Sequence, residues 1–202
     1  MKRRTLLATS CALPLALTFT RAFPAAREPT IGGPCDGCDW VFDGQPSKLD
    51  STSRIAPVGQ RGTPMTLTGV VTNAGGTPAP DIIVYAYHTD EGGIYPAAAN
   101  RHGTLRGWAL TDAQGRYRFD SIRPGAYPSR NIPEHVHMHV IEPGVGTYYI
   151  NNLEFLDDPL LTTRRDDGRG GSGLAMPVRH DGAWQVRRDI VLGRNISEYP
   201  AR

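Results

Sequence analysis

Short apolar stretches alternate along most of the chain with clusters of glycine, proline, asparagine and aspartate. Within the stretches, apolar residues recur at every second position or form runs of β-branched and aromatic residues, and both patterns are typical of β-strands. The clusters between them contain the residues that tight turns favour. The pattern therefore predicts strands at residues 66–72, 82–88, 108–111, 117–119, 135–142, 148–155 and 185–192.

The strand pattern and the composition together predict an all-β fold. The 202 residues include 23 glycines and 17 prolines, which disfavours helices of ordinary length. Short strands separated by such turns favour an antiparallel β-sandwich with long loops and few or no helices. We assign residues 61–202 to this sandwich and residues 27–60 to an irregular N-terminal arm laid across it. Residues 157–182 form a long polar loop, of the kind that is usually functional or mobile.

Residues 1–26 have the pattern of an export signal. Lys2, Arg3 and Arg4 precede an apolar run at residues 6–19, and small residues suited to cleavage follow it. The run is too short and too interrupted to span a bilayer. We therefore expect a periplasmic or secreted protein, exported by the Sec or the twin-arginine route, with no membrane association after signal removal.

The charge balance changes once this signal is set aside. The whole chain has a formal net charge of +2. Residues 27–202 carry 18 basic and 20 acidic residues, which gives a net charge of −2. Nucleic-acid binding requires clustered positive charge that neutralises phosphates. We therefore expect no nucleic-acid partner.

Two cysteines, Cys35 and Cys38, remain after signal removal, in a Cys-x-x-Cys spacing. Two ligands do not complete a structural zinc site. A redox dithiol is an alternative, but no thioredoxin-like βαβ pattern follows. In an oxidising compartment, the pair is expected to form a local disulfide that closes a turn.

Three histidines, His135, His137 and His139, alternate with apolar residues in one predicted strand. Alternation places all three imidazoles on one face of the sheet. Imidazoles are costly to bury without partners or a metal, so the stripe is a candidate metal site. The alternative is a polar, solvent-facing stripe.

Two tyrosines, Tyr95 and Tyr127, lie in glycine- and proline-rich loops outside the strand pattern. Packing under a turn would explain either of them alone. Tyrosinate is a hard anionic oxygen donor that suits Fe(III), and imidazole completes such a donor set. Two tyrosinates and two imidazoles would therefore form a ferric centre.

Here the chain resembles the intradiol ring-cleavage dioxygenases, which include protocatechuate 3,4-dioxygenases and catechol 1,2-dioxygenases. The resemblance rests on residues 105–119, on 122–128 and on His135-Val136-His137. It extends to 68–87 and 152–159, and more loosely to 189–193. The combination of Gly-x-Tyr-Pro with His-x-His at this spacing is its most specific part. The sandwich expected above is then of the transthyretin-like (prealbumin-like) kind.

The resemblance implies a non-haem Fe(III) site with Tyr95, Tyr127, His135 and His137 as ligands. Tyr127 and His137 would be axial, and Tyr95 and His135 equatorial with a hydroxide. Tyr127 would also be catalytic, because it would leave the metal and help to take the two protons of a catechol. The implied reaction cleaves a catechol-type aromatic diol with O2 to a muconate-type diacid.

The chain departs from the family pattern at several positions. Ile132 stands where relatives often have an arginine that stabilises charge on the substrate, and Arg130 is close enough to replace it. Asn152 stands where glutamine is common, and it is a candidate substrate-binding residue with Arg101. Either Arg101 or Arg130 could hold a substrate carboxylate.

The helical N-terminal linker of catechol 1,2-dioxygenases has no counterpart in the predicted elements. The chain therefore resembles the shorter, protocatechuate-type or exported members. Relatives of this kind usually associate, so a homo-oligomer is also expected.

Two other functions compete with this one. The same sandwich could be a non-catalytic, transthyretin-like binding module. It could also be a periplasmic copper- or zinc-binding protein that uses His135, His137 and His139. Tyr95 and Tyr127 discriminate, because only the ferric site requires two phenols from loops.

Overall fold

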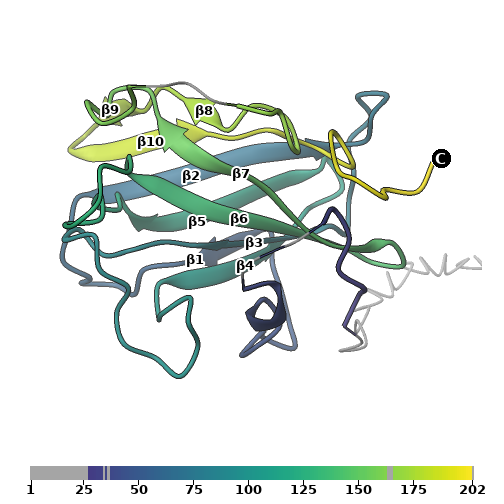
Figure 1. Ribbon diagram of the computed structural model, residues 1–202, viewed down its shortest axis with the longest axis horizontal. Helices are drawn as coiled ribbons and strands as arrows, with labels where there is room; N and C mark the ends of the chain where they lie inside the picture. Colours follow the sequence, from purple (N-terminus) through teal and green to yellow (C-terminus); the bar gives the residue numbers. More distant parts are fainter. Residues whose placement is uncertain (1–26, 34, 36, 163–165, 202) are drawn as a thin grey trace, which may run out of the picture.

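The structure is a computed structural model that describes residues 27–33, 35, 37–162 and 166–201. Figure 1 shows strands that run roughly along the long axis of the molecule. The export signal predicted at residues 1–26 lies outside the described residues. In the described part of the chain, no helix is long and apolar enough to cross a bilayer.

The strands form two sheets that enclose one main core. The first sheet has the order β1-β5-β2-β10-β9, and β11 also pairs with β2. The second has the order β4-β3-β6-β7-β8. The bounds in the first sheet are Thr52–Arg54 (β1), Arg116–Ile122 (β5), Pro64–Thr72 (β2), Ala183–Arg187 (β10), Val178–His180 (β9) and Ile190–Val191 (β11). Those in the second are Arg106–Leu110 (β4), Ile83–Tyr87 (β3), His135–Glu142 (β6), Gly146–Phe155 (β7) and Leu174–Ala175 (β8).

The predicted all-β sandwich is confirmed. The central pairs β2–β5, β3–β4, β3–β6 and β6–β7 are antiparallel. The sheets also contain parallel pairs, β1–β5, β2–β10, β2–β11 and β7–β8, which were not predicted. These pairs involve the short strands of the arm and of the C-terminal third, which reach the sheets through longer connections.

Alternation in β6 separates a face that points into the main core from an outer face that carries the histidines. Val136, Met138 and Val140 point into the main core between the sheets. The three histidines of the same strand therefore point outward. That outer face is covered rather than solvated, because a second apolar cluster, which includes Val41, Tyr85, Tyr87 and Trp108, packs over the neighbouring strands.

The N-terminal arm supplies part of this cover. The short 3-10 helix η1, Cys38–Trp40, leads into Val41, whose carbonyl accepts a hydrogen bond of 2.8 Å from the indole N–H of Trp108. Earlier in the arm, Thr30 forms an isolated bridge with Thr147 in β7. The arm thus lies along the outer face of the second sheet.

The predicted strand 185–192 is interrupted, and the long loop before it is partly ordered into strands. β10 ends at Arg187 and β11 begins at Ile190, because the buried side chain of Arg188 turns away to donate to the carbonyls of Gly170, Gly171 and Asp189. β8 and β9 lie within residues 157–182, where the sequence predicts a loop. Strands of two and three residues carry too little pattern to be predicted.

His88, just after β3, makes stability depend on pH. Its Nδ1 donates to the Thr89 carbonyl at 2.6 Å, and its Nε2 accepts from the Ser121 hydroxyl at 2.7 Å. Burial lowers the pKa of His88 to about 4, whereas an unfolded histidine titrates near 6.5. The unfolded chain therefore takes up the proton first, so stability falls as pH decreases from about 6.5 to 4.

We expect His88→Gln to lose this part of the pH dependence. The wild-type contribution corresponds to about 3 kcal/mol, fully present above pH 6.5 and lost by about pH 4. Urea unfolding at several pH values should show a shallower decline for His88→Gln than for the wild type. Exposed His180→Gln is the control, and parallel curves for all three proteins would refute the assignment.

Candidate metal centre

Two loops of the same local sequence, Gly-x-Tyr-Pro, present the two tyrosines. Gly93 precedes Tyr95, and Gly125 precedes Tyr127. Gly93 has a positive φ of 76°, and a Cβ on it would overlap the backbone carbonyl of Ala126. A Cβ on Gly125 would overlap the carbonyl of Glu91 in the same way. The glycines therefore allow the two tyrosine loops to pack backbone against backbone.

This packing brings the two phenols together. The hydroxyls of Tyr95 and Tyr127 are 2.7 Å apart, and Tyr127 Oη is 3.5 Å from His137 Nε2. Burial, and then the hydrogen bond with Tyr127, raises the pKa of Tyr95 well above its ordinary value. The Tyr95 phenol therefore keeps its proton at neutral pH unless a cation is close by.

The proton positions of His135 and His137 follow from their partners. His135 Nδ1 lies 2.7 Å from the carbonyl oxygen of Pro133, which can only accept, so Nδ1 carries the proton. The Tyr149 hydroxyl donates to Asn152 Oδ1 and therefore accepts, at 2.8 Å, from His137 Nδ1. Both Nε2 atoms are then unprotonated, and they lie only 3.1 Å apart.

Two unprotonated imidazole nitrogens at this distance repel each other. Burial lowers the pKa of His135, and it lowers the pKa of His137 well below its ordinary value. Protonation of either imidazole, which would place a proton between the two nitrogens, is therefore unfavourable. A cation that accepts both lone pairs removes the repulsion. With Tyr95 and Tyr127 beside them, the donor set of two phenols and two neutral imidazoles fits a ferric ion.

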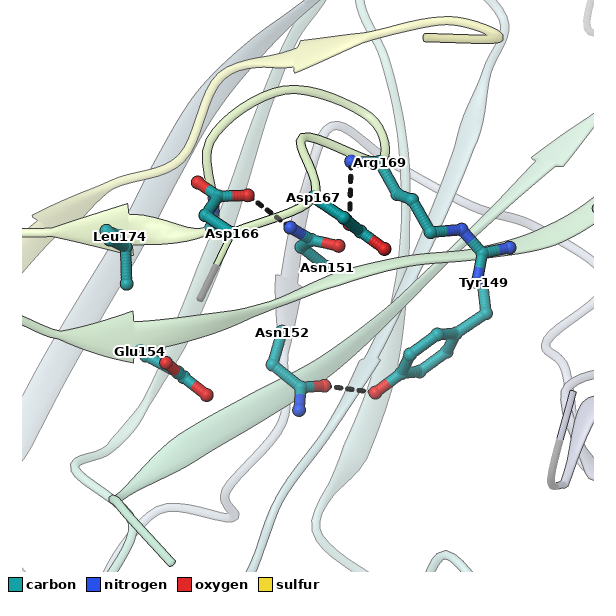
Figure 2. Close-up of a pocket in the computed structure, with 9 residues that line it drawn as sticks. Tyr149, Asn151, Asn152, Glu154, Asp166, Asp167, Arg169 and Leu174 are labelled. Atoms are coloured by element: carbon teal, nitrogen blue, oxygen red, sulfur yellow. Dashed lines mark hydrogen bonds between the residues drawn. The ribbon is translucent and has the colours of Figure 1, made fainter. Parts of the chain in front are cut away.

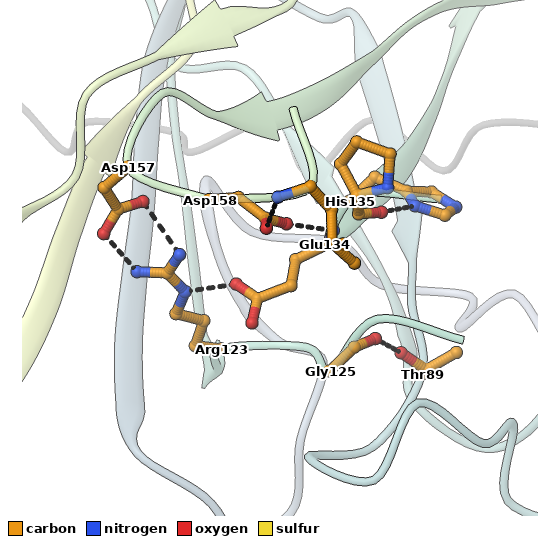
Figure 3. Close-up of polar contacts among 9 residues, drawn as sticks. Thr89, Arg123, Gly125, Glu134, His135, Asp157 and Asp158 are labelled. Atoms are coloured by element: carbon orange, nitrogen blue, oxygen red, sulfur yellow. Dashed lines mark hydrogen bonds and ion pairs between the residues drawn. The ribbon is translucent and has the colours of Figure 1, made fainter. Parts of the chain in front are cut away.

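A charged network fixes the start of β6. Figure 3 shows Arg123 between Glu134, at 2.6 Å, and Asp157, which it contacts through two hydrogen bonds of 2.7 and 2.8 Å. Asp158 accepts from the backbone N–H of Glu134 at 2.6 Å. These contacts hold the residue next to His135 from two sides. Figure 3 also shows Thr89 donating to the Gly125 carbonyl, which anchors the Tyr127 loop.

A cavity of about 290 Å³ lies beside Tyr149, the residue whose hydroxyl contacts His137. Tyr149 and Asn152 lie in its wall, together with Glu154, Asp166 and Arg169 (Figure 2). Figure 2 shows the hydrogen bond between Tyr149 and Asn152 that orients His137. Asn152, the candidate substrate-binding residue, therefore lies beside the centre.

The two candidate arginines lie on loops near the tyrosines. The side chains of Arg101 and Arg130 are exposed, and Ile132 is half-buried. The backbone N–H of Arg130 donates to the Tyr127 carbonyl at 3.2 Å, which closes a turn after this tyrosine. Their roles toward a substrate stay predictions.

The histidine stripe is divided between two environments. His139 is fully buried, so the third histidine is not part of a polar surface. Its Nδ1 lies 3.7 Å from Cys38 Sγ and 3.9 Å from Cys35 Sγ. Cys35 and Cys38 form the disulfide that the sequence predicts. The copper or zinc alternative placed His139 with His135 and His137, whereas here it faces the disulfide.

Sequence analysis missed two residues of the centre, Tyr149 and Tyr87. Tyr149 orients His137, and the ring of Tyr87 stacks on His137 with 4.5 Å between ring centroids. Both lie on strands that flank β6, where Tyr149 pairs with His139 and Tyr87 pairs with His137. The sequence places both aromatic residues in strands but does not show which strands pair, so it gives neither residue a role.

Comparisons with known proteins find dioxygenases. A family model described as "Dioxygenase" matches residues 39–167. The chain is 32% identical over 117 residues to the protocatechuate 3,4-dioxygenase beta chain of Burkholderia cepacia, covering 52% of this chain and 48% of the relative. It is 36% identical over 109 residues to hydroxyquinol 1,2-dioxygenase of Rhodococcus opacus, covering 53% and 34%. The chain thus spans about half or less of the length of these curated relatives.

Solved structures share the fold. The dioxygenase domain of a dioxygenase–carbohydrate-binding protein fusion from Streptomyces sp. SirexAA-E superposes with a TM-score of 0.60 at 24% identity, covering 82% of this chain and 98% of that one. Catechol 1,2-dioxygenase from Acinetobacter sp. ADP1 superposes with a TM-score of 0.62 at 19% identity, covering 79% and 62%.

Proposed function

The chain belongs to the intradiol ring-cleavage dioxygenase family, and from this membership we propose that it is a non-haem Fe(III) enzyme that cleaves a catechol-type aromatic with O2. The observation that carries the proposal is the convergence of four donor atoms, from Tyr95, Tyr127, His135 and His137, with both imidazole lone pairs directed at one another. A non-catalytic binding module would not require two phenols and two unprotonated imidazole nitrogens at one point.

The proposed reaction is balanced without a further reductant. The bond between the two hydroxyl-bearing ring carbons breaks, and both atoms of O2 enter the product, a muconate-type diacid. When bound, the ferric ion would act as a Lewis acid and template for the diol.

The residues of the chain prepare this site in distinct ways. Pro133 and Tyr149 hold the Nδ1 protons of His135 and His137, so that both Nε2 atoms are available as ligands. Tyr127 is half-buried, and its Oη lies within reach of both Tyr95 and His137. We assign to Tyr127 Oη the acceptance of a diol proton, because this oxygen contacts both the other phenol and the imidazole of His137.

A visible absorption spectrum of the purified protein, with iron analysis, tests the proposal. We expect about one iron per chain and a charge-transfer colour from tyrosinate bound to Fe(III). Anaerobic addition of catechol should shift the band to longer wavelength, because the catecholate becomes a new donor to the same ion. A protein that stays colourless after loading with ferric iron would contradict the ferric centre and favour the binding module.

A colourless protein that retains zinc, or one that retains copper with a different spectrum, would instead support the metal-binding alternative. Export by residues 1–26, homo-oligomeric assembly and the substrate roles of Arg101 and Arg130 stay proposals from the sequence.

A further inference from the structure

The Cys35–Cys38 disulfide and His139 form a second group of metal-ligating side chains that the dioxygenase chemistry does not use. Both sulfurs face the same nitrogen, His139 Nδ1, at 3.9 and 3.7 Å. Cys38 and His139 are buried, and Cys35 is half-buried. Cys35 precedes η1, Cys38 begins it and His139 lies on β6, more than 100 positions away, so only the fold brings them together.

The hydrogen bonding of His139 is poor for a buried imidazole. Its Nδ1 faces two disulfide sulfurs, which are weak acceptors, and its Nε2 has no hydrogen-bond partner in the described structure. Buried polar groups normally have partners, so an imidazole in this position calls for an explanation.

We propose that Cys35, Cys38 and His139 form a zinc site when the disulfide is reduced. Two cysteines and one histidine are a known zinc donor set, with the fourth position open to a water molecule. Two thiolates balance the charge of Zn2+, so the complex with a neutral imidazole is electrically neutral and suits a buried position. The proposal does not depend on the dioxygenase activity.

The sulfur–nitrogen distances already suit zinc, whereas the two sulfurs must move apart. Zn–S bonds of about 2.3 Å and Zn–N bonds of about 2.0 Å, at tetrahedral angles, place sulfur and nitrogen about 3.5 Å apart. The observed sulfur–nitrogen distances of 3.7 and 3.9 Å are close to this value. The two sulfurs must separate to about 3.8 Å, and half-buried Cys35 offers the side on which this movement can occur.

Reduction and binding are two balanced steps. A trialkylphosphine and one water reduce the disulfide, so that phosphorus is oxidised to the phosphine oxide and each sulfur gains one hydrogen from the water. Zn2+ then replaces the two thiol protons, which are released to solvent. A phosphine serves better than a dithiol, because a dithiol would itself compete for zinc.

Equilibrium dialysis of the iron-loaded full chain against Zn2+ tests the proposal. We expect the phosphine-reduced protein to hold about one more zinc per chain than the oxidised protein. Zinc bound at the iron centre would not require reductant, so the difference reports on the cysteines. All samples carry Cys11→Ser, which removes the third thiol. Equal zinc content in the two forms, or loss of the fold on reduction, would overturn the proposal.

Two variants identify the ligands. Cys35→Ser/Cys38→Ser should lose the additional zinc entirely. His139→Asn keeps both thiols, and we expect it to weaken zinc binding at least about tenfold. Unchanged binding in a folded His139→Asn protein, judged by circular dichroism, would exclude the assigned site. If this variant does not fold, the comparison of reduced and oxidised wild type still decides the outcome.

Discussion

Replacement of Tyr127 by phenylalanine should lower the rate of ring cleavage by about 10²- to 10⁴-fold, the range typical for loss of a positioned proton acceptor. The ring remains, so the Tyr127 loop keeps its packing, and only the hydroxyl shared with Tyr95 and His137 is lost. Part of the tyrosinate-to-iron absorbance should disappear as well, because one of two phenolate donors is gone. Single-turnover kinetics and the visible spectrum measure the two effects.

Tyr199→Phe is the matched control for this variant. The Tyr199 hydroxyl donates to Glu142, away from the metal centre, so its loss should leave both the spectrum and the rate unchanged. A Tyr127→Phe protein with wild-type colour and rate would show that Tyr127 is neither a ligand nor a proton acceptor.

Replacement of Gly93 by alanine should reduce kcat/KM by about 10²-fold, with a smaller effect on global stability. The new Cβ overlaps the Ala126 carbonyl, and the positive φ of 76° is unfavourable for alanine. The Tyr95 and Tyr127 loops must then separate. A displacement of about 1 Å at a reacting centre costs a factor of this size. Both loops lie outside the sheets, so the main core is retained.

Gly92→Ala provides the control at the neighbouring position. Its Cβ would approach only the side chain of Asp90, at 3.3 Å, and it has no positive φ. We expect near-wild-type activity and colour for Gly92→Ala, and weaker iron retention for Gly93→Ala. Equal activity of the two variants would show that the close approach of the loops is not needed for the centre. Thermal unfolding of both proteins separates this effect from a loss of stability.

The local sequence pattern is sufficient to predict the main strands, two candidate ligands and the disulfide of this protein. The strands β2, β3, β6 and β7 are predicted, because two-residue alternation and turn residues act over short distances. The candidate ligands Tyr95 and Tyr127 stood out for the same reason: a phenol between glycine and proline does not fit a strand. The Cys35–Cys38 disulfide joins residues only three positions apart, so it too could be inferred locally.

The local sequence pattern does not predict the short edge strands. β1, β8 and β9 have two or three residues each, and they exist because a longer neighbour supplies hydrogen-bond partners. The break at Arg188 likewise depends on carbonyls of a loop 17 or 18 residues earlier in the chain.

The division of the histidine stripe depends on what covers each imidazole. Alternation in the sequence places His135, His137 and His139 on one face, but it does not say what packs over that face. The loops of Tyr95 and Tyr127 cover the first two histidines, whereas the arm lays Cys35 and Cys38 against the third. Such contacts join segments that are far apart in the chain, and they form only when both sheets and the arm are packed together.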